Sequence, residues 1–479
     1  MRRSLWMMSL VLGGCSMHDV QPRTRPDVSI PVAWDAPYED GQAVDRWWLS
    51  FEDDQLDAFV IQALANNQSL RQAWARMAQA AAVAGISAAP LLPEMDLRTR
   101  NFTRTLTDVR QDGGSIPAGS YYDTSVIVGV GLSWELDIWN RVSNTAEASL
   151  LAAQASRADV EATALAITGL VADAWFTIRA QRELLSVLHE QVDVSKALLE
   201  SVEFRYANGL GTALQVLQQR QQLEAVRAVV PPTEARLDAA WNALATVLGR
   251  TPQQLQPELI DPSLPALPAF PRLGAPADLL TRRPDLRARQ QLLASADHSV
   301  AAAVAAMLPT LSLSINGDLH YDRVGGPLAS TTASVGGSLF QPIFDANRRG
   351  LEVDRQKAIV EERLGAFAET FLNAIREVDD ALEQERWQLV LLEEISTQLD
   401  IARLQLREAH LQYTEGVAEY LDVISAIQTL QTLQRQDVEA RRQLLVYRAN
   451  LYLALGGSWM EDLEPHIAVE HILEEERSS

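Results

Sequence analysis

Two stretches of this 479-residue chain share one pattern: residues 205–217 read RYANGLGTALQVL and residues 412–424 read QYTEGVAEYLDVI. In each, a tyrosine precedes a glycine by three residues, and an apolar run follows. Tyr206 matches Tyr413 at a spacing of 207 residues, and Gly209 matches Gly416 at the same spacing. This period is far too long for a solenoid repeat, so the pattern indicates that one large unit has been duplicated.

Heptads lead into both stretches, and they predict long coiled-coil helices. Gly209 and Gly416 are natural helix stops, because glycine adopts the left-handed conformation that ends many helices. Each half is therefore expected to hold two very long antiparallel helices joined at its glycine. Residues 143–207 alone would extend for roughly 100 Å. The apolar positions seven residues apart are Val171, Ile178, Leu185, Val192, Leu199 and Tyr206, and then Leu392, Leu399, Leu406 and Tyr413.

Before each long helix, the sequence alternates with the period of a β-strand. Residues 122–136 place valines, leucines and Trp134 on one face and serines, glycines and acids on the other. Residues 310–321 alternate in the same way over a length that would span a membrane as part of a barrel. The partner strands are expected at about 94–106 and 331–344, around polar loops at 107–120 and 322–330. Within 94–106, three arginines would face a lumen or another subunit: Arg98, Arg100 and Arg104.

Four strands are too few to close a membrane barrel, since the smallest barrels have about eight. An open edge in lipid would leave backbone hydrogen-bonding groups unpaired. The strands therefore predict an oligomer, with two, three or four subunits remaining open at this point. An amphipathic sheet on a domain outside the membrane is the alternative.

The N-terminus, MRRSLWMMSLVLGGC, has the order of an export signal: two arginines, a short apolar run, then small residues. It is too short to remain as a membrane-spanning helix. Leu12-Gly13-Gly14-Cys15 resembles the lipobox of bacterial lipoproteins. That resemblance implies that residues 1–14 are removed and that Cys15 carries diacylglycerol and palmitate. Ser16, which follows, implies sorting to the outer membrane.

Composition excludes several classes of function. The net charge of −22 repels phosphate backbones, so no nucleic-acid partner is expected. One cysteine and seven scattered histidines offer no metal-binding pattern, and no catalytic motif is present, so we expect neither a cofactor nor an enzyme. No stretch of 18 consecutive apolar residues predicts a transmembrane helix.

Several further motifs show a resemblance to a known family. They are RRPDLR at 282–287, AAMLPTLSL at 305–313, WELDIWNR at 134–141 and FQPIFD at 340–345. With the segment from Tyr413 to Leu430, they resemble the TolC-like outer membrane factors of bacterial tripartite pumps, and most closely the OprM/NodT lipoprotein branch. The resemblance covers the chain to about residue 457.

This resemblance implies a mainly α fold with a β-barrel part. A homotrimer would form a twelve-stranded barrel in the outer membrane and a twelve-helix tunnel in the periplasm. The expected partners are a periplasmic adaptor protein, an inner-membrane transporter and outer-membrane lipid. The expected segments are a signal peptide (1–14), a lipidated segment (15–51), a first repeat (52–250, with hairpins 94–136 and 141–248), a Pro-rich linker (251–274), a second repeat (275–457, with hairpins 310–344 and 346–455) and an acidic tail (458–479).

In this family, acidic residues just after the turns help to form a closable gate. Asp422 matches that place, and Gln215 stands there in the first repeat, so a ring of charge would have three carboxylates rather than six. Tyr206 and Tyr413 are candidates for contacts that hold the gate closed, with ordinary coiled-coil packing as the alternative. For Asp422 the alternative is a helix cap or a solvated face.

We therefore predict an outer-membrane exit duct for efflux of small molecules such as drugs or toxic compounds. A duct for type I protein secretion and a tethering coiled-coil lipoprotein without a channel are the alternatives.

Overall fold

A computed structural model describes residues 18–21, 25–34, 45–106, 121–255, 263–321 and 326–464, with backbone alone for 101–106 and 121–125. The predicted signal peptide, Cys15, loop 107–120 and most of the acidic tail lie outside the described residues. The chain divides into two compact units. The first contains Met1–Pro26, Met77–Ser156 and Arg289–Phe367, and the second contains Asp27–Arg76, Arg157–Ala288 and Ala368–Ser479.

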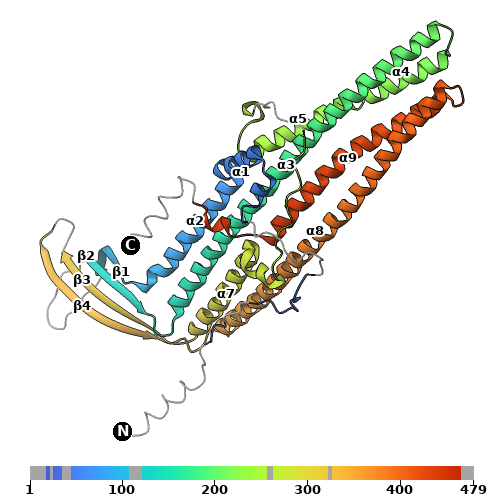
Figure 1. The fold of residues 1–479 in the computed structure, drawn as a ribbon. Helices are drawn as coiled ribbons and strands as arrows, with labels where there is room; N and C mark the ends of the chain where they lie inside the picture. Colours follow the sequence, from blue (N-terminus) through green and yellow to red (C-terminus); the bar gives the residue numbers. More distant parts are fainter. Residues whose placement is uncertain are drawn as a thin grey trace, which may run out of the picture. The chain divides into compact units, whose positions relative to one another are not determined.

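The first unit contains one antiparallel sheet with strands in the order β1-β2-β3-β4 (Figure 1). Its register places the apolar positions of neighbouring strands opposite one another. Leu132 pairs with Ile315 and Val128 pairs with Leu319, so the apolar faces predicted for the two strands form one surface. This confirms the alternation that the sequence showed. The strands are β1 (Glu94–Leu106), β2 (Tyr121–Leu136), β3 (Thr310–Tyr321) and β4 (Leu328–Phe340).

Strand β4 begins and ends earlier than the predicted range of 331–344. It starts at Leu328, within the loop predicted for 322–330, and stops at Phe340. Two residues later stands Pro342, which has no N–H to donate to a neighbouring strand.

Two helices of 67 residues each, α3 (Arg141–Ala207) and α8 (Arg348–Thr414), are the longest elements among the described residues. At 1.5 Å per residue each extends for roughly 100 Å, as predicted. Each is followed by a turn and a helix that returns beside it (Figure 1). In the second repeat the returning helix is α9 (Tyr420–Leu455), which is continuous.

The returning helix of the first repeat is interrupted, which was not predicted from the sequence. It consists of α4 (Ala213–Arg227) and α5 (Val230–Val247). Pro231 and Pro232 lie in the first turn of α5, where the missing N–H groups are tolerated. Within a continuous helix these prolines would remove two hydrogen bonds and clash with the preceding turn.

The coiled-coil seam is buried along only part of its length. Val171 and Ile178 are fully buried, whereas Leu185, Val192 and Leu199 are half-buried. The side chain of Tyr206 is half exposed, so it does not continue the packed seam. An 18-residue window of α3 is long and apolar enough to cross a membrane (mean hydropathy 1.2), but 56% of that window is buried within the chain. This makes it weak evidence for a membrane-spanning helix.

Shorter helices and 3-10 turns complete the described chain. They are α1 (Asp54–Asn66), α2 (Gln68–Ala88), α6 (Leu279–Arg282) and α7 (Pro284–Ala305), with 3-10 turns η1 (Trp47–Phe51), η2 (Ala89–Leu91), η3 (Pro252–Gln254), η4 (Pro276–Asp278) and η5 (Trp459–Asp462).

Aromatic packing joins η1 to the end of the described chain in the second unit. Trp47 stacks on Tyr452 of α9 with ring centroids 5.8 Å apart, and Trp48 meets Trp459 of η5 edge to face at 4.9 Å. The carboxylate of Asp45 accepts a hydrogen bond from the main-chain N–H of Trp459 at 2.9 Å. Such buried aromatic pairs contribute more than their area alone, about 0.5–1.5 kcal/mol each.

The RRPD motif, residues 282–285, has a structural role within the second unit. Arg283 is buried, and its guanidinium donates to Glu377 at 2.7 Å and to the main-chain oxygen of Ala454 at 3.1 Å. It thereby holds the start of α7 against α8 and against the last turn of α9. Gly456 completes this junction, because a Cβ there would lie 2.5 Å from the main-chain oxygen of Arg282.

The first repeat builds the same junction with a different side chain. Asn67, between α1 and α2, donates from Nδ2 to the main-chain oxygen of Val247 at 2.7 Å. A Cβ on Gly249 would lie 2.3 Å from the main-chain oxygen of Asn66. Asn67 thus does in the first repeat what Arg283 does in the second, and both junctions require a glycine after the returning helix.

Candidate functional site

The two turns that join the long helices have nearly the same geometry. Gly209 has φ +73° and Gly416 has φ +77°, the left-handed conformation expected of a helix stop. The N–H of Leu210 donates to the main-chain oxygen of Arg205 at 2.9 Å, and the N–H of Val417 donates to that of Gln412 at 2.9 Å. A Cβ on either glycine would meet nothing within 4 Å, so conformation alone requires glycine here.

Gln215 and Asp422 occupy equivalent capping positions at the starts of α4 and α9. Oε1 of Gln215 accepts the main-chain N–H of Thr212 at 3.0 Å, and Oδ2 of Asp422 accepts that of Glu419 at 3.1 Å. The side chain of each therefore stabilises the first turn of its own helix. Asp422 is exposed, so its charge is also available to solvent. The capping alternative considered for Asp422 is thus present in the structure and leaves its second oxygen available.

Tyr413 lies among side chains from both repeats. Its ring is tilted against that of Tyr420, with centroids 5.2 Å apart, and the guanidinium carbon of Arg205 lies 5.2 Å from its centroid. The hydroxyl of Tyr420 donates to Oε1 of Gln219 at 2.8 Å. Burial, with a smaller contribution from Tyr413, raises the pKa of Tyr420 to about 12. Tyr206, half exposed, is not part of this group.

Apolar packing surrounds this polar group and also joins the two repeats. Val202 and Val216 from the first repeat pack in one cluster with Tyr420, Val423 and Ile427 from α9. The predicted gate residues are therefore divided. Tyr413 packs against this cluster, whereas Gln215 and Asp422 cap helices beside it.

A row of buried glutamines, which was not predicted from the sequence, continues the contact between the repeats. Nε2 of Gln222 donates to Oε1 of Gln431 at 2.9 Å, and Nε2 of Gln191 donates to Oε1 of Gln434 at 2.8 Å. Nε2 of Gln219 donates to the main-chain oxygen of Ser195 at 2.9 Å. These amides are satisfied by one another or by the main chain, so the seam between the hairpins is partly polar even where it is buried. The only signal in the sequence is the glutamine-rich composition of α4 and α9.

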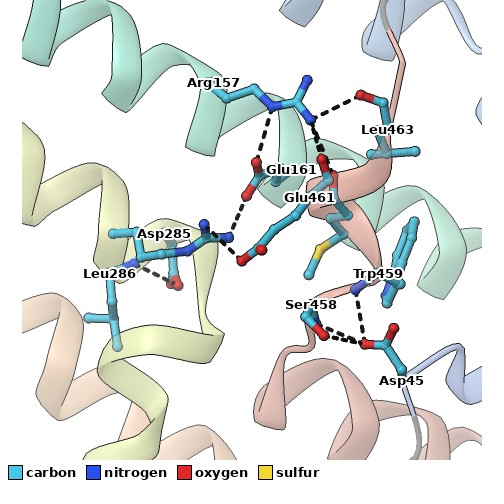
Figure 2. A network of polar contacts seen from close by, with 11 residues as sticks. Asp45, Arg157, Glu161, Asp285, Leu286, Ser458, Trp459, Glu461 and Leu463 are labelled. Atoms are coloured by element: carbon cyan, nitrogen blue, oxygen red, sulfur yellow. Dashed lines mark hydrogen bonds and ion pairs between the residues drawn. The ribbon is translucent and has the colours of Figure 1, made fainter.

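Closer to the start of α3, a polar network joins this helix to α7 and to the C-terminal segment (Figure 2). Glu161, which is 3% exposed, accepts from Nε of Arg157 at 3.1 Å and pairs with Arg287. Arg157 also donates to the main-chain oxygens of Glu461 and Leu463 at 3.0 Å each. The buried carboxylate of Glu161 is paired with two guanidiniums, and the bonds from Arg157 hold the end of the described chain on α3.

Within the described ranges, no group of three or more His, Cys, Asp or Glu side chains is arranged to hold a metal ion.

The coiled-coil hairpins, the amphipathic sheet and the duplicated turns together define a class of protein. Comparison of the chain with known protein families identifies that class. The sequence profile of outer membrane efflux proteins matches residues 60–250 and 275–457, and the chain belongs to this family. It is therefore an outer-membrane efflux channel, built as a helical tunnel with a barrel part.

Individual relatives match over nearly their whole length. The pyoverdine export outer membrane protein OpmQ of Pseudomonas aeruginosa is 30% identical over 96% of this chain and 97% of its own. Nodulation protein T of Rhizobium leguminosarum bv. trifolii is 26% identical, covering 94% and 96%. Among solved structures, the outer-membrane channel OprN has a TM-score of 0.84 and 26% identity, covering 92% and 99%. None of these names describes an enzyme.

Proposed function

We propose that three copies of this chain form one exit duct for small molecules, with a twelve-stranded barrel across the outer membrane. The four-stranded sheet is the observation that carries this proposal. Within the described chain, β1 and β4 are edge strands that each pair on one side only. Both expose apolar side chains: Leu97 is 71% exposed and Val335 is 74% exposed.

An apolar sheet with two open edges is stable in lipid only when its edges pair with further strands. Pairing β4 of one copy with β1 of the next satisfies both edges and repeats until the barrel closes. Three copies supply twelve strands, the number that the family resemblance implies.

The proposed cargo is a small molecule, because OpmQ is named for pyoverdine export and another relative, TtgC of Pseudomonas putida, is named as a toluene efflux pump protein. A periplasmic adaptor and an inner-membrane transporter would supply cargo and energy, since the chain itself offers a passive duct. We also propose that Cys15 carries diacylglycerol and palmitate, which would anchor the chain in the outer membrane.

The gate is proposed at the duplicated turns. Three copies of Asp422 around a narrow lumen would attract cations and repel one another once ionised. Tyr413, held by Tyr420 and Arg205, would connect the two hairpins near this point, and Tyr206, with its half-exposed ring, would be available to a neighbouring copy.

Reconstitution into a planar lipid bilayer tests this function. Protein extracted from outer membranes in mild detergent should give discrete current steps, and the same sample dissociated by heat should give none. Absence of steps from intact protein, in a preparation where a known porin conducts, would refute the proposed duct.

A further inference from the structure

A buried carboxylate on α7 holds the segment that follows Cys15. Asp297 is 4% exposed. Its Oδ1 lies 2.7 Å from Nε2 of His18, and its Oδ2 accepts the main-chain N–H of Gln21 at 2.7 Å. Both oxygens of one side chain are thus occupied by a four-residue stretch, residues 18–21, which we name the N-terminal strap.

The strap satisfies a group that would otherwise be costly to bury. A carboxylate removed from water needs hydrogen bonds to both of its oxygens, and leaving it without partners is strongly unfavourable. The side chain of His18 is 26% exposed and that of Asp297 is 6% exposed, so the strap covers the carboxylate from the outside. Docking of the strap therefore replaces the hydrogen bonds of this carboxylate to water with hydrogen bonds from the strap.

We propose that Asp297 is the docking site for this chain's own N-terminal strap and thereby fixes where the lipid on Cys15 enters the membrane. The second part rests on the proposed lipidation. Cys15 stands three residues before His18, so its Cα lies within about 10 Å of the Cα of His18.

The same unit contains the foot of the sheet. From Asp297, α7 continues for eight residues to Ala305, a rise of about 12 Å, and β3 starts at Thr310. With a tether and a rise this short, we expect the acyl chains to enter the leaflet near the foot of β3 of the same chain. The anchor is then a fixed part of its own subunit rather than a long loose tether.

Limited digestion with trypsin tests the docking. Arg23 lies two residues after Gln21 and is followed by threonine, so trypsin can cut there once the strap is released. Full-length protein in mild detergent should be cut slowly at Arg23. Asp297→Ala removes both acceptors and should raise the initial cutting rate about tenfold or more, the factor that corresponds to one lost hydrogen bond to a charged group.

His18→Ala changes only a half-buried strap residue outside α7, so it should raise the rate even if Asp297→Ala folds poorly. Asp19→Asn is the matched control, because among the described residues that carboxylate bonds within the strap, to Gln21 Nε2 at 3.0 Å. Its rate should equal that of the unchanged protein. Equal rates for His18→Ala and Asp19→Asn would overturn the proposal.

The mass of the released N-terminal peptide separates docking from lipidation. An acylated peptide with slow release supports both parts of the proposal. A peptide without acyl groups would overturn the membrane placement and leave the docking of the strap to be judged by the cutting rates alone. Neither result depends on whether the protein conducts, so failure of the duct would be recognised separately.

Discussion

Replacing Gly456 by alanine should destabilise the second unit far more than the same change at the turn between α8 and α9. Gly456 has φ +70° and ψ −152°, a backbone conformation that is essentially restricted to glycine and costs an alanine about 1–3 kcal/mol. The added Cβ would also lie 2.5 Å from the main-chain oxygen of Arg282 and 3.0 Å from its carbonyl carbon. Displacing that backbone adds about 1–3 kcal/mol, the usual cost of overpacking. The expected total is about 2–6 kcal/mol.

Matched alanine variants separate the two contributions. Gly416→Ala also has a positive φ, +77°, in a helix-stopping turn, but nothing lies within 4 Å of the added Cβ, so it should lose only about 1–2 kcal/mol. Gly365→Ala lies inside α8 with open space around it and should gain about 0.5–1 kcal/mol. Gly249→Ala, at the equivalent junction of the first repeat, should resemble Gly456→Ala.

Thermal melts followed by circular dichroism at 222 nm, in one detergent and at one heating rate, would rank the four variants. The expected order of melting temperature is Gly365→Ala highest, then Gly416→Ala, with Gly249→Ala and Gly456→Ala lowest. Equal melting temperatures for Gly416→Ala and Gly456→Ala would refute the account of the junction, because the close approach to Arg282 would then contribute nothing.

Three other changes test other parts of the structure. Asp422→Ala should alter single-channel conductance and weaken block by divalent cations, and unchanged single-channel records would exclude it from the gate. Tyr420 has a pKa raised to about 12, above the ordinary value of 10, so its contribution to stability is complete below pH 10 and is lost as pH rises towards 12. Between pH 10 and pH 12 the free energy of unfolding should therefore fall more steeply for the unchanged protein than for Tyr420→Phe. Parallel curves for the two proteins would contradict the raised pKa of Tyr420. Arg448→Met leaves Glu385, which is 2% exposed, without its ion-pair partner and should cost about 3–5 kcal/mol, whereas adding Glu385→Leu should recover part of that loss. Chemical denaturation of the single and double variants measures this, and equal stability of the two would refute it.

The parts of the fold that depend on local periodicity could be predicted from the sequence. Alternation along 122–136 and 310–321 gave the correct faces, because side-chain direction in a strand has a period of two wherever the strand pairs. The helix stops followed from Gly209 and Gly416 for a similarly local reason. Pro231 is a residue that interrupts helices, so the break before it had a signal in the sequence. The long heptad pattern nevertheless led to the prediction of a continuous helix.

The parts that depend on partners far away in the sequence could not be predicted. Asn67 and Arg283 share no residue type, yet both bind the last turn of a returning helix, and only the three-dimensional junction shows that they are equivalent. From the sequence alone, Gln222 and Gln431 would be predicted to lie on the surface. Their amides are buried only because α4 and α9 lie side by side. The same holds for Asp297, whose partners are 276 and 279 residues away.

The oligomeric mass of the intact protein tests the central claim most directly. The molar mass of protein extracted from the outer membrane should be measured by light scattering, corrected for bound detergent, before and after heating. Circular dichroism of the same samples measures the strand content. A particle of three chains, rich in helix and strand, that loses its strand signal only when heat separates the chains is the predicted result. A monomer or dimer, or a strand signal that persists in separated chains, would contradict a barrel closed by three copies.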